Sequence, residues 1–280
     1  MTPRALARVT VTVAVAGGRG VRVATRPPVV FITGASSGIG MALAVHYASL
    51  GASLGLYARR QPELDALAAR LPAGTVATYA GDVRDAGALQ RAAADFIARF
   101  GIPDIVIANA GVSRGTLTEH ADDLAAFQAV LDTNVMGLVH TFHPFVAPMR
   151  AAGRGALAGI ASVAGFRGLP GSGAYSASKA AAITYLESLR VEMAGTGVAV
   201  VTICPGYIAT PMTEKNPYRM PFLIDADKAA RRIAVAIRRR RRYYVFPWPM
   251  AAVGRVLSWL PRPVYDALFA RAPRKPRTPG

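Results

Sequence analysis

Short apolar runs alternate with alanine-rich stretches from residue 28 onward, and this alternation constrains the fold more than any other feature. The runs are apolar along most of their length, which is typical of strands covered on both faces. The strand candidates are residues 29–33, 53–58, 76–80, 105–109, 155–160, 198–203 and 243–246. The helix candidates between them are residues 62–70, 86–100, 124–151, 174–194 and 227–240. This order predicts an α/β fold: a doubly wound parallel sheet of about seven strands with helices on both faces.

No internal repeat or polar linker divides the 280 residues, so we expect a single domain over residues 29–248 with an extension at each end. Residues 1–28 form a basic N-terminal extension that we expect to be disordered. Its apolar run at 9–16 leaves a leader peptide open, but a bilayer span needs about 20 residues. Residues 249–280 form an amphipathic, basic C-terminal extension.

The formal net charge of +17 comes from the two ends of the chain. Residues 29–212 hold twelve basic and twelve acidic side chains, whereas residues 213–280 hold sixteen basic and four acidic ones. A neutral body argues against a nucleic-acid-binding surface. The five arginines at 238–242, followed by aromatic residues, could suit a single-strand binder, but they fall at the end of a predicted helix, where cations complement the dipole. We therefore expect no nucleic-acid partner.

The cysteine and histidine content argues against an internal disulfide and against a metal site. The single cysteine, Cys204, can form no internal disulfide, and it suits a reducing cytoplasm. The four histidines have no paired spacing with carboxylates or cysteines, so we expect no metal site.

The first predicted strand leads directly into the sequence TGASSGIG at residues 33–40. Glycines at such a strand-to-helix turn let the chain bend sharply and let backbone amides approach a pyrophosphate at the helix N-terminus. The residues assigned to this phosphate turn are Gly34, Ser36, Ser37, Gly38, Ile39 and Gly40.

After the second predicted strand, the position at which NAD sites place a carboxylate is followed by Arg59 and Arg60. Arginine presents a fork that suits a phosphate, so the pair predicts NADP(H) as the cofactor. The alternative is that both arginines are merely solvated at a helix start. Asp82 either accepts a hydrogen bond from the adenine or caps the helix that starts near Asp85. The residues that close the same crevice are Asp82, Val83, Asn109, Ala110 and Gly111.

Tyr175 and Lys179 lie four residues apart at the start of an alanine-rich helix, so their side chains share one face. An ammonium about 5 Å away, at an effective dielectric of about 20, favours the phenolate by roughly 3 kcal/mol, or about two pK units. This predicts a phenol pKa shifted toward neutrality, where general acid–base catalysis operates. Ser162 follows the fifth strand, and its hydroxyl can hold the same substrate oxygen.

Together these motifs resemble the short-chain dehydrogenase/reductase family over residues from about 28 to 244. The matching positions are Thr33, Gly34, Gly38, Ile39 and Gly40; Asn109, Ala110 and Gly111; Asn134, Ser162, Tyr175 and Lys179; and the sequence PGYIAT at residues 205–210. Two departures are Ala108 in place of a first asparagine, and the extended basic C-terminus.

The resemblance implies a Rossmann-type fold and hydride exchange between a nicotinamide and a carbonyl or alcohol carbon. It implies that Tyr175 donates the proton, that Lys179 lowers its pKa and holds the ribose, and that Ser162 polarises the carbonyl. Asn134 would anchor a water that links Lys179 to solvent. The residues implied to lie along the nicotinamide are Pro205, Gly206, Ile208 and Thr210.

The segment after residue 210 is rich in apolar side chains and resembles a lid, which predicts a hydrophobic substrate. The lid candidates are Met212, Tyr218, Met220, Phe222 and Leu223. In the C-terminal extension, apolar residues recur at helical spacing at Met250, Val253, Val256, Leu257 and Leu260. That helix either lies on an anionic membrane surface or packs against the protein's own body or a partner subunit.

We therefore expect a cytoplasmic, homo-oligomeric NADP(H)-dependent oxidoreductase that acts on a small hydrophobic carbonyl or alcohol compound, with membrane-surface association left open. The alternatives are a non-catalytic NADP(H)-binding sensor and a membrane-surface regulatory protein.

Overall fold

A seven-stranded parallel sheet forms the centre of the computed structural model, which describes residues 9–11, 23–72, 74–214, 216 and 219–277. Its strands are β3 (Val29–Thr33), β4 (Ser53–Ala58), β5 (Val76–Ala80), β6 (Ile105–Ala108), β7 (Gly155–Ile160), β8 (Val198–Pro205) and β11 (Tyr243–Phe246). Their order is β11-β8-β7-β6-β3-β4-β5, and every neighbouring pair is parallel. The predicted doubly wound sheet is confirmed.

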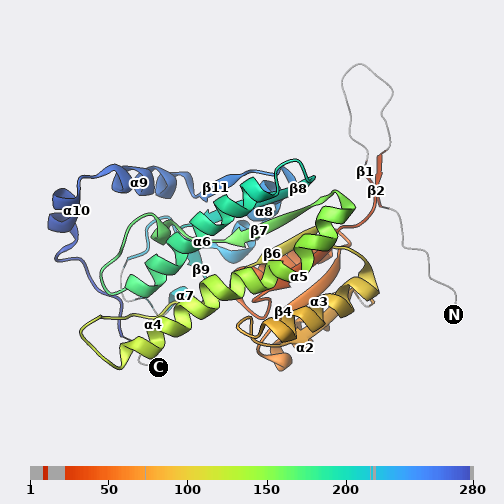
Figure 1. Ribbon diagram of the computed structural model, residues 1–280, viewed down its shortest axis with the longest axis horizontal. Coiled ribbons are helices and arrows are strands. Elements are labelled where there is room, and N and C mark those ends of the chain that lie inside the picture. Colours follow the sequence, from red (N-terminus) through yellow and green to blue (C-terminus); the bar gives the residue numbers. More distant parts are fainter. Residues whose placement is uncertain (1–8, 12–22, 73, 215, 217–218, 278–280) are drawn as a thin grey trace, which may run out of the picture.

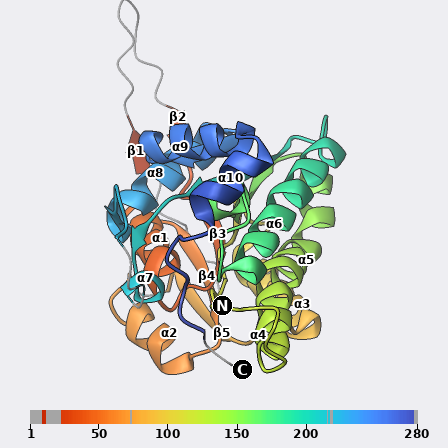
Figure 2. The same cartoon turned by 90° about the vertical axis from the view of Figure 1, so that its left-hand side faces the viewer.

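Helices cover both faces of the sheet (Figures 1 and 2). One face carries α1 (Gly38–Ser49), α2 (Gln61–Ala68) and α8 (Ala226–Arg238). The other carries α3 (Ala86–Phe100), α4 (Asp123–Leu131), α5 (Gly137–Ala152) and α6 (Gly173–Glu192). Because side chains alternate along a strand, Ile32 packs into one hydrophobic cluster and its neighbour Phe31 into the other.

The strand order reverses between β3 and β6, because the chain runs from β3 to β4 and β5 before it returns to the other side of β3. In an open α/β sheet, the crevice beyond the carboxyl ends of strands at such a switch point is where ligands bind. The fold therefore places the phosphate turn and the segment after β6 side by side.

The single helix expected over 124–151 is interrupted. A π-helical turn, η1 (Asp132–Met136), separates α4 from α5. From this turn, the hydroxyl of Thr133 donates to the carbonyl of Ala129 in α4. A π turn inserts about one residue into the helix without breaking its apolar pattern, so the periodicity did not predict it.

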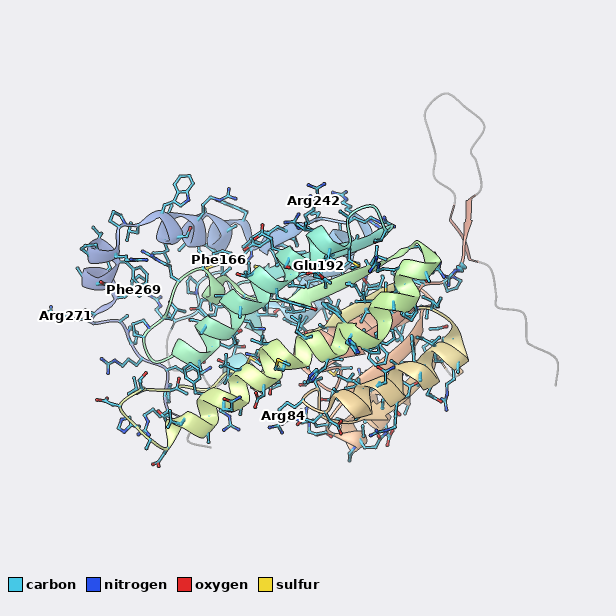
Figure 3. All side chains as sticks on the ribbon, viewed as in Figure 1. Arg84, Phe166, Glu192, Arg242, Phe269 and Arg271 are labelled. Atoms are coloured by element: carbon cyan, nitrogen blue, oxygen red, sulfur yellow. The ribbon has the colours of Figure 1, made fainter. Side chains whose placement is uncertain are left out.

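The arginine run lies at the end of α8, as predicted. α8 ends at Arg238, and Arg240, with a φ of 49°, donates to the carbonyl of Gly197. The guanidinium of Arg241 lies 5.3 Å from the ring centroid of Tyr244, while the carbonyl of Arg242 accepts from Thr202. These contacts tie the run to the edge of the sheet, where Figure 3 labels Arg242.

The N-terminal extension is described only in part. β1 (Val9–Val11) pairs antiparallel with β2 (Val23–Thr25), apart from the main sheet. The rest of residues 1–22 lies outside the described residues, so disorder of that part stays a prediction.

The C-terminal extension packs against the domain. α9 (Trp248–Trp259) and α10 (Arg262–Phe269) follow β11, and residues 270–277 then run back toward α4 (Figures 1 and 2). Shorter elements complete this side: η2 (Val163–Gly165), β9 (Ile208–Ala209), α7 (Pro211–Glu214) and β10 (Ile224–Asp225). Within the described part of the chain, no helix is long and apolar enough to cross a membrane.

Candidate active site

The phosphate turn between β3 and α1 has a backbone that requires glycine. Gly34 and Gly38 have φ values of 69° and 55°, in the left-handed region. A Cβ on Gly40 would overlap the carbonyl oxygen of Gly34, so helix and turn can approach only because that side chain is absent. The first amides of α1 have no acceptor within the helix, and Ser37 at the N-cap makes no side-chain capping bond. This turn therefore offers backbone donors to an anion.

Asn109, directly after β6, holds the turn in place. Its Nδ2 donates to the carbonyls of Thr33 (3.0 Å) and Gly34 (3.2 Å). Its backbone amide donates to Oγ1 of Thr33 at 3.2 Å. Asn109 thus fixes the end of β3 to the end of β6, the two strands at the switch point.

At the other end of the crevice, Arg59 and Arg60 are exposed after β4. Nη2 of Arg60 donates to Oγ of Ser36 at 3.2 Å, and Nη1 lies 2.9 Å from the carboxylate of Glu63. Arg60 thereby connects the phosphate turn to the end of β4, within reach of any phosphate bound between them.

One interpretation of Asp82 was wrong. Asp85, not Asp82, caps α3, by accepting a bond from the amide of Ala88 at 2.9 Å. The carboxylate of Asp82 instead accepts from the backbone and guanidinium of Arg84, and this lowers its pKa. Asp82 therefore stays ionised at the rim of the crevice, as a hydrogen-bond acceptor.

A cavity of about 250 Å³ runs from these arginines to Tyr175 and Lys179. Gly40, which lies beneath the turn, is the one predicted cofactor residue outside its lining. The predicted residues that line it are Gly34, Ser36, Ser37, Gly38, Ile39, Arg59, Arg60, Asp82, Val83, Asn109, Ala110, Gly111, Ser162, Tyr175, Lys179, Pro205, Gly206, Ile208 and Thr210. The fold thus brings together residues that span 177 positions of sequence, from 34 to 210.

Tyr175 and Lys179 project from the first turns of α6. Nζ of Lys179 lies 5.7 Å from the ring centroid of Tyr175 and donates to the carbonyl of Ile160 at 2.8 Å. The Lys179 side chain is buried, and burial lowers its pKa to about 8. Ser162, two residues after the end of β7, is hydrogen-bonded to the phenol of Tyr175 and also accepts from the amide of Ala164.

The expected fall in the pKa of Tyr175 is wrong for this structure. Burial raises the pKa of Tyr175, and the hydrogen bond from Ser162 opposes that rise only in part. The expectation counted the attraction of a nearby ammonium and left out the desolvation of the phenolate, which disfavours the charged form. Tyr175 is therefore held protonated.

Asn134 lies on the π turn and is 2% exposed. Its Oδ1 accepts from the amide of Val112 at 2.8 Å, and its Nδ2 donates to the carbonyl of Val112 and to Oγ of Ser178, both at 2.9 Å. A Cβ on Gly111 would lie 3.2 Å from that Oδ1 and 3.6 Å from Nζ of Lys179. Asn134 thus joins the segment after β6 to α6. Its role as a water anchor stays a prediction.

Thr213 is a site residue that the sequence analysis missed. Its hydroxyl donates to the carbonyl of Ile208 at 2.6 Å and accepts from the amide of Thr210 at 3.0 Å, which shapes the loop after β8. The signal was a second threonine three positions after Thr210, a spacing that suits a local side-chain-to-backbone bond.

A second cavity, of about 330 Å³, opens on Ser162 and Tyr175 from the other side. Of the lid candidates, Met212 and Phe222 line it, while Tyr218 lies outside the described residues. The lining from the C-terminal extension, which the sequence analysis did not assign to the site, consists of Met250, Val253, Gly254, Leu257, Phe269 and Lys275. Figure 3 labels Phe166 beneath α9 and Phe269 on α10, at the end of the molecule where this cavity lies.

Dinucleotide-dependent oxidoreductases place a phosphate turn at the switch point of the sheet and their reacting groups farther along the same crevice, and this chain follows that plan. Residues 28–220 match the family model of the short chain dehydrogenases. The chain therefore belongs to the short-chain dehydrogenase family, whose members are oxidoreductases acting on CH–OH or C=O groups.

Individual relatives agree with this placement. An uncharacterised oxidoreductase of Myxococcus xanthus is 39% identical over 242 residues, which are 86% of this chain and 95% of the relative. A short-chain dehydrogenase/reductase from Burkholderia phymatum, solved with NAD, has a TM-score of 0.75 at 26% identity and covers 90% of this chain and 98% of its own. An alcohol dehydrogenase from the archaeon Thermococcus sibiricus, complexed with 5-hydroxy-NADP, has a TM-score of 0.69 at 25% identity and covers 78% and 95%.

Proposed function

We propose that the protein is an NADP(H)-dependent carbonyl reductase or alcohol dehydrogenase for an apolar substrate. The observation that carries the proposal is the meeting of two cavities at Ser162 and Tyr175. One leads from these residues to the phosphate turn and to two arginines, and the other has a mainly apolar wall.

The residues present fit a nicotinamide dinucleotide phosphate. The phosphate turn offers backbone donors at the start of α1, and the left-handed glycines keep side chains out of that space. Arg59 and Arg60 supply positive charge where an NAD site would have a carboxylate, which favours a 2′-phosphate. Solved relatives carry either NAD or an NADP derivative, so the preference for NADP rests on these two arginines. When bound, the nicotinamide supplies or accepts the hydride.

The proton that the carbonyl oxygen receives comes from the protein itself. In the direction of reduction, Tyr175 is held protonated by its raised pKa and donates its proton to the carbonyl oxygen while the hydride adds to the carbon. Ser162 donates a hydrogen bond to the same oxygen. Lys179, with a pKa of about 8, is mostly charged at neutral pH and stabilises the phenolate that remains.

Turnover of Tyr175→Phe tests this mechanism. Purified protein is assayed for NADPH oxidation with aldehydes and ketones of graded chain length. Because the phenylalanine keeps the ring and removes only the proton donor, we expect kcat to fall by roughly 10²- to 10⁴-fold with an unchanged dissociation constant for NADPH. Tyr79→Phe is the matched control, since its hydroxyl bonds Asp95 away from the site. Unchanged turnover in Tyr175→Phe would contradict the mechanism, and NADPH binding without any turnover by wild type would favour the sensor.

Dissociation constants for NADPH and NADH test the cofactor. A hydrogen-bonded charge pair contributes about 1.5–3 kcal/mol, so we expect Arg59→Ala to weaken NADPH binding by about tenfold or more and to change NADH binding little. Arg70→Ala, exposed beyond the end of α2, is the control. If wild type prefers NADH, the argument from the arginines is wrong.

A second proposal concerns the outer face of the C-terminal extension. Trp248 and Trp259 are 79% and 82% exposed, and Val256 between them is 61% exposed. Arg255 and Arg262 are exposed on the same helices. Apolar rings flanked by cations suit the interface of an anionic membrane, so we propose that this face binds one.

Flotation with vesicles of phosphatidylserine and phosphatidylcholine tests that proposal. We expect wild type to float and Trp248→Ser with Trp259→Ser not to float, whereas Leu124→Ser, at an apolar residue 65% exposed on α4, should float normally. Equal flotation of the tryptophan variant would contradict membrane binding. A vesicle-free dimer that dissociates in the same variant would identify the face as a subunit interface instead.

A further inference from the structure

The last described residues return to the domain and are fastened there. After α10, residues 270–277 run toward α4 (Figures 1 and 2). Nε and Nη2 of Arg277 lie 2.8 and 3.1 Å from the carboxylate of Asp123, whose side chain is buried. A Cβ on Gly171 would lie 3.0 Å from the backbone nitrogen of Lys275, so the returning segment lies close against the loop before α6. The position of Lys275 is therefore fixed on both sides.

Lys275 lines the substrate-side cavity with a neutral partner. Its Nζ donates to Oγ of Ser113 at 2.7 Å. Among the described residues that line this cavity there is no aspartate or glutamate. The wall around it is largely apolar, including Leu169, Leu257 and Phe269. Burial lowers the pKa of Lys275. A partly buried cation in such surroundings is destabilised unless an anion accompanies it.

Lys275 is not needed to anchor the returning segment, because the neighbouring cation Arg277 does so. Arg277 has its own buried carboxylate and fastens the segment, so that fastening does not require Lys275. Arg274 is exposed to solvent. Among the described cations of residues 270–277, Lys275 is the one that lines the cavity. No carboxylate among the described lining residues accompanies it.

We propose that Lys275 and Ser113 recognise an anionic group of the substrate, so that the substrate is an apolar carbonyl or alcohol compound that also bears a carboxylate or a phosphate. This inference rests on the proposed function and names its substrate class. Ser162 and Tyr175 hold the oxygen that reacts, while Lys275, which lines the same cavity, binds the anion. The anionic group takes no part in the chemistry, in which hydride adds to the carbonyl carbon and the proton to its oxygen.

Binding tests the inference without turnover. Isothermal titration with unreactive alkanoates of six to twelve carbons, and with their methyl esters, compares an anion with a neutral group on one skeleton; alkyl phosphates form a third arm. A charge-assisted contact is worth about 1.5–3 kcal/mol, so wild type should bind the best alkanoate or alkyl phosphate about tenfold or more tightly than the ester. Lys275→Met should lose this preference and Lys275→Arg should keep it. Lys228→Met, at a surface lysine 3.3 Å from Asp225, should behave as wild type.

Turnover of aldehydes that carry a terminal carboxylate, compared with their methyl esters, gives the kinetic readout. Lys275→Met should raise KM for the acids with little change in kcat and leave the esters unaffected. Equal binding of acids and esters by wild type, or tight acid binding by Lys275→Met, overturns the inference while ester turnover leaves the proposed reductase standing. Lysine-dependent acid binding without turnover of any carbonyl supports the anion site and overturns the proposed function.

Discussion

Replacing Lys179 by methionine should stabilise the folded protein although it removes a residue of the proposed machinery. The side chain is 5% exposed, and burial lowers its pKa from 10.5 to about 8. Each tenfold change in proton affinity is worth about 1.4 kcal/mol, so the charged form costs about 3 kcal/mol at pH 7. Methionine fills similar space without charge but leaves the carbonyl of Ile160 without its donor, a loss of about 1 kcal/mol. The expected net gain is about 2 kcal/mol.

The pH dependence of the stability difference identifies the buried charge of Lys179 as its cause. Between pH 8 and 10.5, the folded state binds fewer protons at Lys179 than the unfolded state does, so wild-type stability rises with pH in that window. The methionine variant lacks this rise. Its advantage should therefore be fully present at and below about pH 7 and should be close to zero by pH 10, where the remaining charge cost of about 1 kcal/mol is offset by the lost hydrogen bond.

Urea unfolding at pH 7 and pH 10, followed by circular dichroism, measures both quantities. Lys228→Met is the matched control, because its ammonium is exposed and its loss should change stability by no more than about 0.5 kcal/mol. A Lys179→Met protein that is less stable than wild type at pH 7 would refute the reasoning. So would an advantage of equal size at both pH values.

Three further predictions follow from close packing, an ion pair and a buried thiol. Gly40→Ala should weaken NADPH binding by about tenfold or more, because its Cβ would overlap the Gly34 carbonyl; Gly173→Ala, where a Cβ meets open space, should bind normally in the same titration. Arg277→Ala leaves the buried Asp123 without its ion partner, so trypsin should release the C-terminal segment faster than from wild type, as mass spectrometry can follow; equal rates would contradict the contact. Burial raises the pKa of Cys204 to about 11, so iodoacetamide at pH 8 should label it slowly until urea is added, and prompt labelling of the native protein would contradict its burial.

The inner strands of the main sheet were predictable because they are buried on both faces and read as short apolar runs, as Val29–Thr33 does, whereas the edge strands β5 and β11 are only partly buried. The π turn at Asp132–Met136 was not predictable, since an extra residue in a helix leaves the apolar pattern nearly unchanged. The role of Asp82 is decided by a local contact: the guanidinium of Arg84, two residues on, binds its carboxylate, and Asp85 caps α3 instead. The position of Asp85 directly before the predicted helix already favoured it as the cap, whereas the geometry of the Arg84 side chain was not readable from the sequence.

The position of the candidate site followed from motifs at strand ends, because parallel strands place their carboxyl ends at one edge. The burial and the pKa values of the groups in the site could not be predicted from these motifs. The pKa of Tyr175 depends on how much solvent reaches the phenol, which pairwise spacing to Lys179 does not contain. Lys275 entered the site because the chain returns after α10, a path that no local pattern indicates.

The structure also bears on the two alternatives stated for the amphipathic C-terminal helix, which are binding to a membrane surface and packing against the protein. α9 was expected either to lie on a membrane or to pack against the body, but its apolar residues divide between two faces. Met250, Gly254 and Leu257 line the substrate-side cavity, and Gly254 is so close to Phe166 that a Cβ there would lie 2.5 Å from the ring. Trp248 and Trp259 point away into solvent. The domain covers one of these apolar faces and leaves the other exposed to solvent. Packing of α9 against the domain is therefore compatible with the proposed membrane contact, because it leaves Trp248 and Trp259 exposed on the outer face.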